Sequence, residues 1–453
     1  MATVDGLHAS LQTPQSVSSA EYWRRVCSSL HVNDTEFQEQ TTHASDVASA
    51  EACADVRDRL IEEGYAALPP SSLRWNVSVA SLSEGILALE QHGWPASFIM
   101  MFDETWVMNR DVASIMAKAT GNTPCMDIVG FHVDPRRQAS KGFSPHRDRQ
   151  PEDWTLKGVP SAVSATFKED GMAKYVTLWC ALTDASPDNS CLHFIPKSCD
   201  PGYAAGDPDE GDPLKRCFME NAQFQNIRCA PVAAGGCTFH THRTIHWGNC
   251  GRASYTGSPR IALSFGCSTQ DFEPPYFSPK SLPFPSVRLR AALAAAQVLN
   301  YATLATTDEK GWAALAGSMA SCTSSTLRLL HGVFCRNAKA FHKTYRKEIG
   351  QKFVNVTLSM GPISSSKVTM GEAPHATRAP GAYAEQATKE VGGCQDSDDD
   401  DDALKALLNV EAASGEVLFH DDFDMLNSHH AVPTKKHGRR RRLTNAGKKR
   451  PRH

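Results

Sequence analysis

The sequence predicts a mainly β core, of the sandwich or jelly-roll kind, with α-helices on either side and a disordered C-terminal tail. Between about residues 128 and 280, short apolar and β-rich runs alternate with Pro, Gly, Asp and Asn, a spacing typical of all-β sandwiches and jelly rolls. The segments before and after this region carry apolar residues at helical spacing. Beyond residue 361 the chain is small, polar and proline-punctuated before it becomes strongly charged, which is the composition of a disordered segment.

These observations divide the 453 residues into one large domain with extensions at both ends. The predicted parts are a flexible N-terminus over 1–19, a folded domain over 20–353 and a disordered tail over 361–453. Within the folded domain we expect a helical region over 20–127, the jelly-roll core over 128–280 and a second helical region over 286–353.

Two stretches carry the N-terminal helical prediction. In "ACADVRDRLIEEGYAAL", Val56 and Leu60 share a face and Gly64 is a suitable C-terminal stop. In "SVASLSEGILALEQHGW" the spacing is also helical, although Ser83 and Gly85 weaken it. The C-terminal helices are predicted from "SVRLRAALAAAQVLNYATLA" and "SSTLRLLHGVFCRNAKAFHKTYRKEI". The core strands are predicted from "MDIVGFHV", "AKYVTLWCAL", "SCLHFIP", "GGCTFHTH" and "PRIALSFGC".

Composition restricts the class of protein. No run approaches the roughly 18–20 apolar residues that span a bilayer, and the first residues lack both the basic start and the apolar stretch of a secretory signal. The 14 cysteines form no CxxC pair, so we expect free thiols in a reducing compartment and no structural zinc module. The sequence therefore predicts an intracellular protein with no membrane span.

One short stretch, "SPHRDR", suggests metal chemistry. A mononuclear Fe(II) centre that activates O2 needs two neutral imidazoles and one carboxylate on one face, with open positions on the other. His146 and Asp148 stand two positions apart, so on an extended strand their side chains emerge on the same face. A distant segment offers a third ligand among His240, His242 and His246, and then Arg260, whose guanidinium can bind a carboxylate through two hydrogen bonds.

These motifs, in this order, resemble the phytanoyl-CoA dioxygenase family of Fe(II)/2-oxoglutarate-dependent oxygenases. "SPHRD" is similar to the family's strand with the first two iron ligands, and "VTLWCALTDASPDNSCLHFIPKSC" to its stretch "W-x-A-L-D-D…N-G-x-L…P-G-S-H". "GGCTFHTHRTIHWGNCGRASYTGSPRIALSF" is similar to its stretch "G-D…F…H-x-S-x-x-N…R-x-A". The resemblance covers about residues 125–272 and implies a double-stranded β-helix, which is a cupin-like jelly roll.

The resemblance also implies the site and the reaction. His146, Asp148 and His246 take the metal and catalytic positions, and Arg260 takes the position that binds the distal carboxylate of 2-oxoglutarate. The implied cofactors are Fe(II), 2-oxoglutarate and O2, and the implied reaction hydroxylates a small organic or acyl substrate while 2-oxoglutarate loses CO2 to become succinate. Related halogenases have a small residue in place of the carboxylate, so Asp148 favours hydroxylation.

The chain departs from the family pattern at several positions. Ser190 stands where the family has Gly after its Asn, and Cys199 stands where a histidine ends "P-G-S-H". Gly248 takes the position of a hydroxyl residue that helps to hold 2-oxoglutarate, so Asn249 or an upstream hydroxyl would have to serve. Arg147, between the two ligands, points either at an anionic substrate or at solvent, and we favour solvent.

Three alternatives remain open at this stage. His240 and His242 offer a zinc site of their own, although no cysteine pair or carboxylate accompanies them in the sequence. The fold can also belong to a catalytically inactive scaffold, or to a nuclear protein that modifies or binds a protein or nucleic acid. The tail favours a nuclear location over the cytoplasm, because "KKHGRRRR" and "KKRPR" resemble signals read by a nuclear import receptor, next to an acidic block over 398–402.

Overall fold

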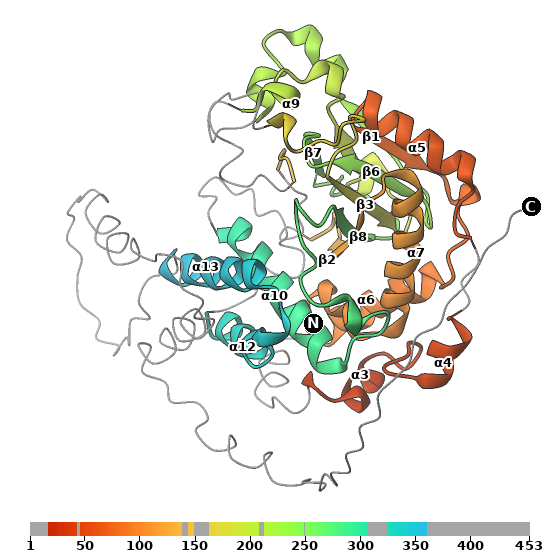
Figure 1. Cartoon of the computed structure of the whole chain (residues 1–453), viewed down its shortest axis with the longest axis vertical. Coiled ribbons are helices and arrows are strands. Elements are labelled where there is room, and N and C mark those ends of the chain that lie inside the picture. The colour runs from red at the N-terminus through yellow and green to blue at the C-terminus, as the bar shows by residue number, and fades with distance from the viewer. Residues whose placement is uncertain are drawn as a thin grey trace, which may run out of the picture. The chain divides into compact units, whose positions relative to one another are not determined.

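The structure is a computed structural model that describes residues 17–42, 46–137, 144–148, 163–207, 213–248, 250–306 and 324–359 (Figure 1). All of them belong to the first of two compact units, Met1–Thr377. The predicted disordered tail, with its acidic block and its basic end, lies outside the described residues, as do most of the predicted flexible N-terminus and Asn249.

The N-terminal region is helical, as predicted for most of its length. Its helices are α3 (Ala20–Val26), α4 (Thr35–Gln40), α5 (Ala50–Glu62), α6 (Val79–Gln91) and α7 (Asp103–Ala119). Val56 and Leu60 are buried on one face of α5, and Gly64 ends it with a φ of +83°. Only glycine adopts this left-handed conformation without a steric cost, which is why the helix stops there.

Five antiparallel strands form the larger sheet. They are β1 (Tyr65–Leu68), β2 (Thr123–Val133), β3 (Tyr175–Ala181), β6 (Cys237–Thr241) and β8 (Arg260–Ser268), in the order β1-β6-β3-β8-β2. The longest pairing joins β2 to β8 and extends from Thr123 opposite Ser268 to Val133 opposite Arg260. All the residues of β3 and β6 are buried, so both faces of these central strands are covered.

The prediction that residues 20–127 are helical throughout is wrong at two places. β1 lies within that region, and β2 begins at Thr123, five residues before the predicted start of the core. Four residues are too few for periodicity to separate a strand from the end of a helix. β1 exists because it pairs with β6, far along the chain, where Tyr65 lies opposite His240.

Three short strands form a second antiparallel sheet. They are β4 (Leu192–Phe194), β5 (Arg228–Ala230) and β7 (His246–Gly248), in the order β5-β4-β7. His146 extends this sheet through a single bridge to His246. The architecture is therefore two antiparallel sheets accompanied by helices, and every strand predicted from the sequence is present.

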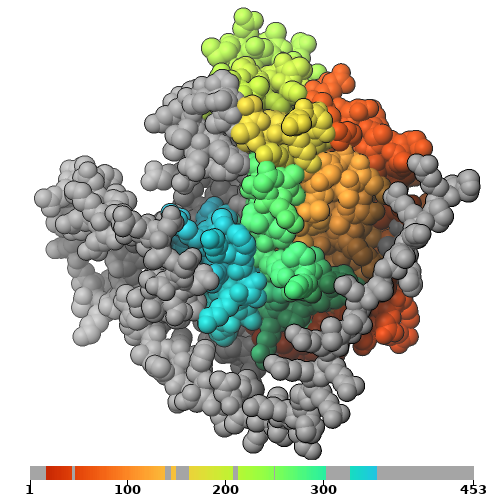
Figure 2. All heavy atoms as spheres, in the orientation of Figure 1, coloured from red at the N-terminus to blue at the C-terminus, as the bar shows by residue number. Residues whose placement is uncertain are grey.

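The predicted C-terminal helical region over 286–353 contains three helices in its described part, and its residues 307–323 lie outside the described residues. The helices are α10 (Val287–Thr306), α12 (Ser324–Cys335) and α13 (Lys343–Ser359), and α12 and α13 both pack against α10 (Figures 1 and 2). Buried polar groups join α10 to the rest of the domain: Gln297 donates to Asp127 at 2.6 Å, and Arg290 pairs with Asp103 at 2.6 Å. Within the described parts of the chain, no helix has both the length and the apolarity that crossing a membrane requires.

Candidate metal centre

Two imidazoles and one carboxylate converge where the smaller sheet meets the larger one. The ligand atoms of His146, Asp148 and His246 all lie within 4.8 Å of one another. Oδ1 of Asp148 is 3.6 Å from Nε2 of His146 and 3.6 Å from Nε2 of His246. The structure thus brings together the three residues that the sequence singled out for iron.

Backbone pairing holds the two histidines side by side. The N–H of His146 donates to the carbonyl of His246 at 3.1 Å, and the N–H of His246 donates back at 3.0 Å. β7, which begins at His246, pairs in turn with β4, where Phe194 lies opposite His246. Two residues far apart in the sequence therefore occupy adjacent positions in one sheet and present their rings together.

Hydrogen bonds at the other ring nitrogen aim both imidazoles at the carboxylate. Nδ1 of His146 lies 2.8 Å from the carbonyl of Ser144, and Nδ1 of His246 lies 3.1 Å from the carbonyl of Thr244. A carbonyl can only accept, so in the neutral ring the proton sits on Nδ1 and the lone pair on Nε2. Both lone pairs therefore face Oδ1 of Asp148, which is the arrangement that a metal ligand needs.

The second oxygen of Asp148 is already occupied. Oδ2 accepts a hydrogen bond from Oγ1 of Thr177 at 2.7 Å and lies 3.0 Å from Nε2 of His240. Thr177 and His240 are cross-strand partners in β3 and β6, so the larger sheet holds this end of the carboxylate. Oδ1 is left for a cation, and His240 orients the carboxylate from the opposite side.

The charge states also suit a metal. Burial alone would raise the pKa of Asp148, but the imidazoles of His246, His146 and His240 hold that pKa well below its usual range. Burial lowers the pKa of His246 well below the usual histidine value. Burial also lowers the pKa of His146, but the Asp148 carboxylate outweighs this and raises it. A bound cation would take over that stabilising role.

Arg260, at the start of β8, has buried donors that bind no group among the residues the structure describes. Its side chain is fully buried, and its Nη1 donates to the carbonyl of Ser190 at 2.7 Å. Nε and Nη2 have no hydrogen-bond partner among the described residues. Burial lowers the pKa of Arg260 to about 10. A buried guanidinium is costly unless an anion meets it, so this residue is suited to bind a carboxylate.

A buried hydroxyl stands beside Arg260. The Oγ of Ser190 also lacks a hydrogen-bond partner among the described residues. A Cβ added at Gly248 would lie 3.2 Å from this Oγ and 3.0 Å from Nη1 of Arg260. Ser190 therefore places its hydroxyl next to the point where a side chain at position 248 would begin. The sequence had flagged both positions only as departures from a pattern.

The prediction that Arg147 points to solvent is wrong, and so is its alternative of an anionic substrate. The side chain is fully buried and forms ion pairs with Asp200 and Asp207, each at 2.6 Å. It also donates to the carbonyl of Arg243. Because side chains alternate along an extended segment, a residue between His146 and Asp148 must point away from the metal centre.

The alternative of a zinc site at His240 and His242 receives no support. His240 contacts Asp148, whereas Nε2 of His242 lies 2.9 Å from Oγ1 of Thr166 and its ring packs near Phe272. Burial lowers the pKa of His242 to about 3, so this ring is a neutral core residue. The two histidines therefore contact different residues and do not form a site together.

Comparison with known proteins gives a family and several similar structures. The model of the family described as "Phytanoyl-CoA dioxygenase (PhyH)" matches residues 41–249. That segment includes His146, Asp148 and His246, ends before Arg260, and begins well before residue 125, where the sequence resemblance was placed. The match confirms the predicted family for residues 41–249, and this family uses Fe(II), 2-oxoglutarate and O2. No curated protein sequence matches the chain.

Similar solved structures include the non-heme alpha ketoglutarate dependent epimerase SnoN from nogalamycin biosynthesis, at 21% identity over 49% of this chain and 84% of that chain, with a TM-score of 0.34. The carbocyclase SnoK from the same biosynthesis is 18% identical over 51% and 90%, with a TM-score of 0.34. HygX from Streptomyces hygroscopicus, with nickel and 2-oxoglutarate bound, is 14% identical over 47% and 86%, with a TM-score of 0.34. By the family match, the chain contains a phytanoyl-CoA dioxygenase family domain over residues 41–249.

Proposed function

We propose that this protein is an Fe(II)- and 2-oxoglutarate-dependent dioxygenase that hydroxylates a small organic or acyl substrate and converts 2-oxoglutarate to succinate. The observation that carries the proposal is the fixed geometry at Asp148. Its Oδ2 is held by Thr177 and His240, while its Oδ1 faces Nε2 of His146 and His246. The family match supports an oxygenase, and the hydroxylation itself is our inference from Asp148.

Three side chains of this protein would hold the iron. Nε2 of His146, Nε2 of His246 and Oδ1 of Asp148 would hold Fe(II) on one side and leave its other side open. Bound iron, with O2 and 2-oxoglutarate, supplies the oxidation of a substrate C–H bond. Asp148 fills the ligand position that is vacant for halide in related halogenases. For this reason we propose hydroxylation as the outcome.

Arg260 would position the cosubstrate. Nε and Nη2, which have no partner among the described residues, match the two oxygens of a carboxylate. The ring centroids of Trp179 and Phe131 lie 5.6 and 5.9 Å from the guanidinium carbon. These rings restrict the guanidinium and keep water away, so an ion pair formed there is stronger than one at the surface. The distal carboxylate of 2-oxoglutarate is the anion that we assign to this position.

The finer fold and location also remain proposals. We infer that the five-stranded and three-stranded sheets form the two halves of a double-stranded β-helix, because the candidate ligands come from the region where they meet. The nuclear location and the macromolecular alternative depend on the tail, which lies outside the described residues.

The proposed function is tested by turnover without a substrate. Purified protein is supplied with Fe(II), 2-oxoglutarate and O2, and succinate is quantified over time. We expect slow succinate formation that requires Fe(II) and stops when a chelator is added. Protein that binds both Fe(II) and 2-oxoglutarate yet forms no succinate, with or without a panel of candidate metabolites, would contradict the assignment.

Replacing Arg260 is expected to weaken cosubstrate binding specifically. Arg260→Met removes the charge and should raise the dissociation constant for 2-oxoglutarate by about thirtyfold to several thousandfold, as truncation of a buried charge pair does. Arg260→Lys keeps the charge but loses the planar guanidinium, so its dissociation constant for 2-oxoglutarate should lie between those of the wild type and Arg260→Met. Calorimetric titration of the iron-loaded protein with 2-oxoglutarate measures the dissociation constants. An unchanged dissociation constant for Arg260→Met would remove Arg260 from the site.

We further propose that Ser190 supplies the second contact to 2-oxoglutarate, in place of the hydroxyl missing at Gly248. Ser190 holds a left-handed backbone with a φ of +80°, which costs a non-glycine residue about 1–2 kcal/mol. A strained residue beside Arg260, whose buried hydroxyl has no partner among the described residues, suggests a functional role. In this proposal Ser190 supplies the hydroxyl that Gly248 lacks.

A swap of the two residues tests this directly. Ser190→Gly should weaken 2-oxoglutarate binding about tenfold to a hundredfold, the value of a hydrogen bond to a charged group. It should not lower the free energy of unfolding, because it relieves the left-handed strain. Adding Gly248→Ser to that variant should restore binding. If Ser190→Gly binds 2-oxoglutarate normally, or if the swap restores nothing, Ser190 is only a structural residue.

A further inference from the structure

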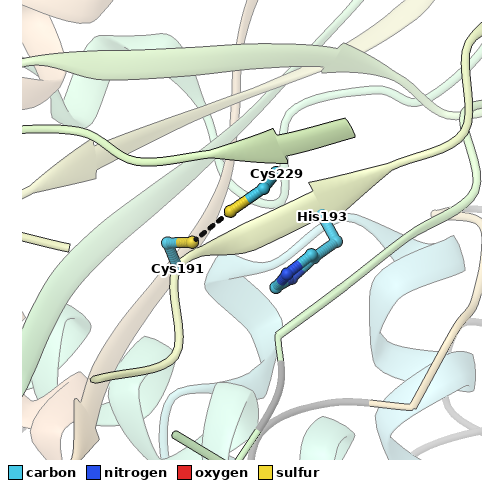
Figure 3. A group of neighbouring side chains, drawn as sticks. All are labelled: Cys191, His193 and Cys229. Carbon is cyan, nitrogen blue, oxygen red and sulfur yellow. Dashed lines mark hydrogen bonds between the residues drawn. The ribbon is translucent and has the colours of Figure 1, made fainter. Parts of the chain in front are cut away.

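A second group of metal-binding side chains lies in the three-stranded sheet. Cys191, His193 and Cys229 place their ligand atoms within 4.8 Å of one another (Figure 3). The two sulfur atoms are 3.3 Å apart. Among the described residues, this cluster and the candidate iron ligands are the two groups of three or more His, Cys, Asp or Glu side chains that meet this criterion.

Strand register explains why the three meet. His193 in β4 lies opposite Cys229 in β5, and directly paired residues point to the same face. Cys191 precedes His193 by two positions, so it also faces that side. Phe194 faces the other way, where its ring lies 6.3 Å from that of His246. The cluster and the candidate iron centre therefore lie on opposite faces of β4.

The histidine of the cluster is oriented and neutral. Its ring stacks on Trp247 with centroids 5.5 Å apart and an interplanar angle of 15°. Its Nδ1 is buried and has no hydrogen-bond partner among the described residues. Burial lowers the pKa of His193 below the usual histidine value. A neutral ring held by stacking is a suitable metal ligand.

We propose that Cys191, His193 and Cys229 bind Zn²⁺, separately from the iron centre. Two thiolates and one imidazole are a set of soft and borderline donors that selects zinc over Fe(II). The charge of Zn²⁺ is balanced by the two thiolates, so the filled site is neutral and can lie near the buried Arg260. Cys229 is exposed, which leaves a fourth position open to water. Such a site exchanges its metal more readily than a closed, four-ligand structural site.

The thiols must lose their protons when the metal binds. A free cysteine thiol has a pKa of about 8.5 and is mostly protonated at neutral pH. Zinc binding would therefore release protons, and zinc affinity should rise as the pH rises. The competing fate of two neighbouring thiols is oxidation to a disulfide, which would bring the sulfur atoms to about 2.05 Å and remove both ligands.

The test uses the full chain, purified under reducing conditions and freed of metal. Co²⁺ is added as a spectroscopic probe, and Zn²⁺ affinity is measured by competition with a chromogenic chelator. We expect a thiolate-to-Co²⁺ absorption band that persists in His146→Ala, where the iron site is broken. Cys191→Ser combined with Cys229→Ser should abolish the band, and His193→Gln and Cys229→Ser should each lower Zn²⁺ affinity on the order of a hundredfold or more. The matched control is Cys199→Ser, because Cys199 is partly exposed and lies outside the cluster. This substitution should change neither the Co²⁺ band nor the Zn²⁺ affinity.

Three outcomes would overturn the proposal. The first is a reduced protein that shows no thiolate band with Co²⁺ and whose zinc binding disappears entirely in His146→Ala. The second is a band that survives the combined Cys191→Ser and Cys229→Ser substitutions, which would place the bound metal on other thiols. If the protein instead shows a Cys191–Cys229 disulfide by mass spectrometry and its reduced form takes up no zinc, the pair is a redox pair and the zinc site does not exist.

Discussion

Alanine in place of Asp148 is expected to abolish turnover of 2-oxoglutarate. The substitution removes Oδ1, the atom that faces Nε2 of both His146 and His246, and leaves two neutral imidazoles as the only ligands. Metal-ion stabilisation amounts to several kcal/mol, so succinate formation should fall about a thousandfold or more. Initial rates of succinate release, measured at saturating Fe(II), give the comparison.

Thr177→Val is the matched control for this experiment. It keeps all three candidate ligands and removes one hydrogen bond, of 2.7 Å, to Oδ2 of Asp148. Loss of such a supporting contact typically lowers metal affinity by about 10–100-fold. Added Fe(II) should therefore rescue Thr177→Val and fail to rescue Asp148→Ala. An Asp148→Ala protein with wild-type turnover would show that the metal is held elsewhere.

Replacing Arg147 by Met should destabilise the fold by about 3–5 kcal/mol, the usual result of removing one partner from a buried ion pair. The side chains of Arg147 and Asp200 are 0% and 1% exposed, so the carboxylate left behind cannot be rescued by water. The same loss affects Asp207, which also pairs with Arg147. Because Arg147 stands between two candidate ligands, metal affinity should fall as well.

Chemical denaturation of the apoprotein measures this effect without interference from bound metal. Arg25→Met is the matched control, since Arg25 is 70% exposed and pairs with Glu21 on the surface of α3. Its substitution should change the free energy of unfolding by about 0.5 kcal/mol or less. If Arg147→Met is as stable as Arg25→Met, the buried ion pairs do not hold this segment in place.

The strands and most helices could be predicted because their signals are local. Runs such as "VTLWCAL" and "RIALSF" are long enough for composition and punctuation to identify them. β1 could not be predicted, because its four residues become a strand only through pairing with β6. The same holds for the bridge between His146 and His246, which depends on a contact between distant segments.

The candidate site was predictable in its residue types and less so in its arrangement. The spacing of His146 and Asp148 identified two ligands, and the family pattern selected His246. No local signal shows that His240 and Thr177 would hold Oδ2, because both lie in the other sheet. Arg147 was misplaced because its partners, Asp200 and Asp207, follow more than fifty residues later and carry no recognisable pattern. The signal for Ser190 was present, in the paired departures at positions 190 and 248, but only the structure relates them.

The most direct test of the iron site is a crystal of the protein grown without oxygen, with Fe(II) and 2-oxoglutarate, measured on both sides of the iron absorption edge. We predict an anomalous peak bonded to Nε2 of His146, Nε2 of His246 and Oδ1 of Asp148, with the distal carboxylate of 2-oxoglutarate on Arg260. An iron peak at any other position, or a cosubstrate carboxylate that does not meet Arg260, would contradict the account.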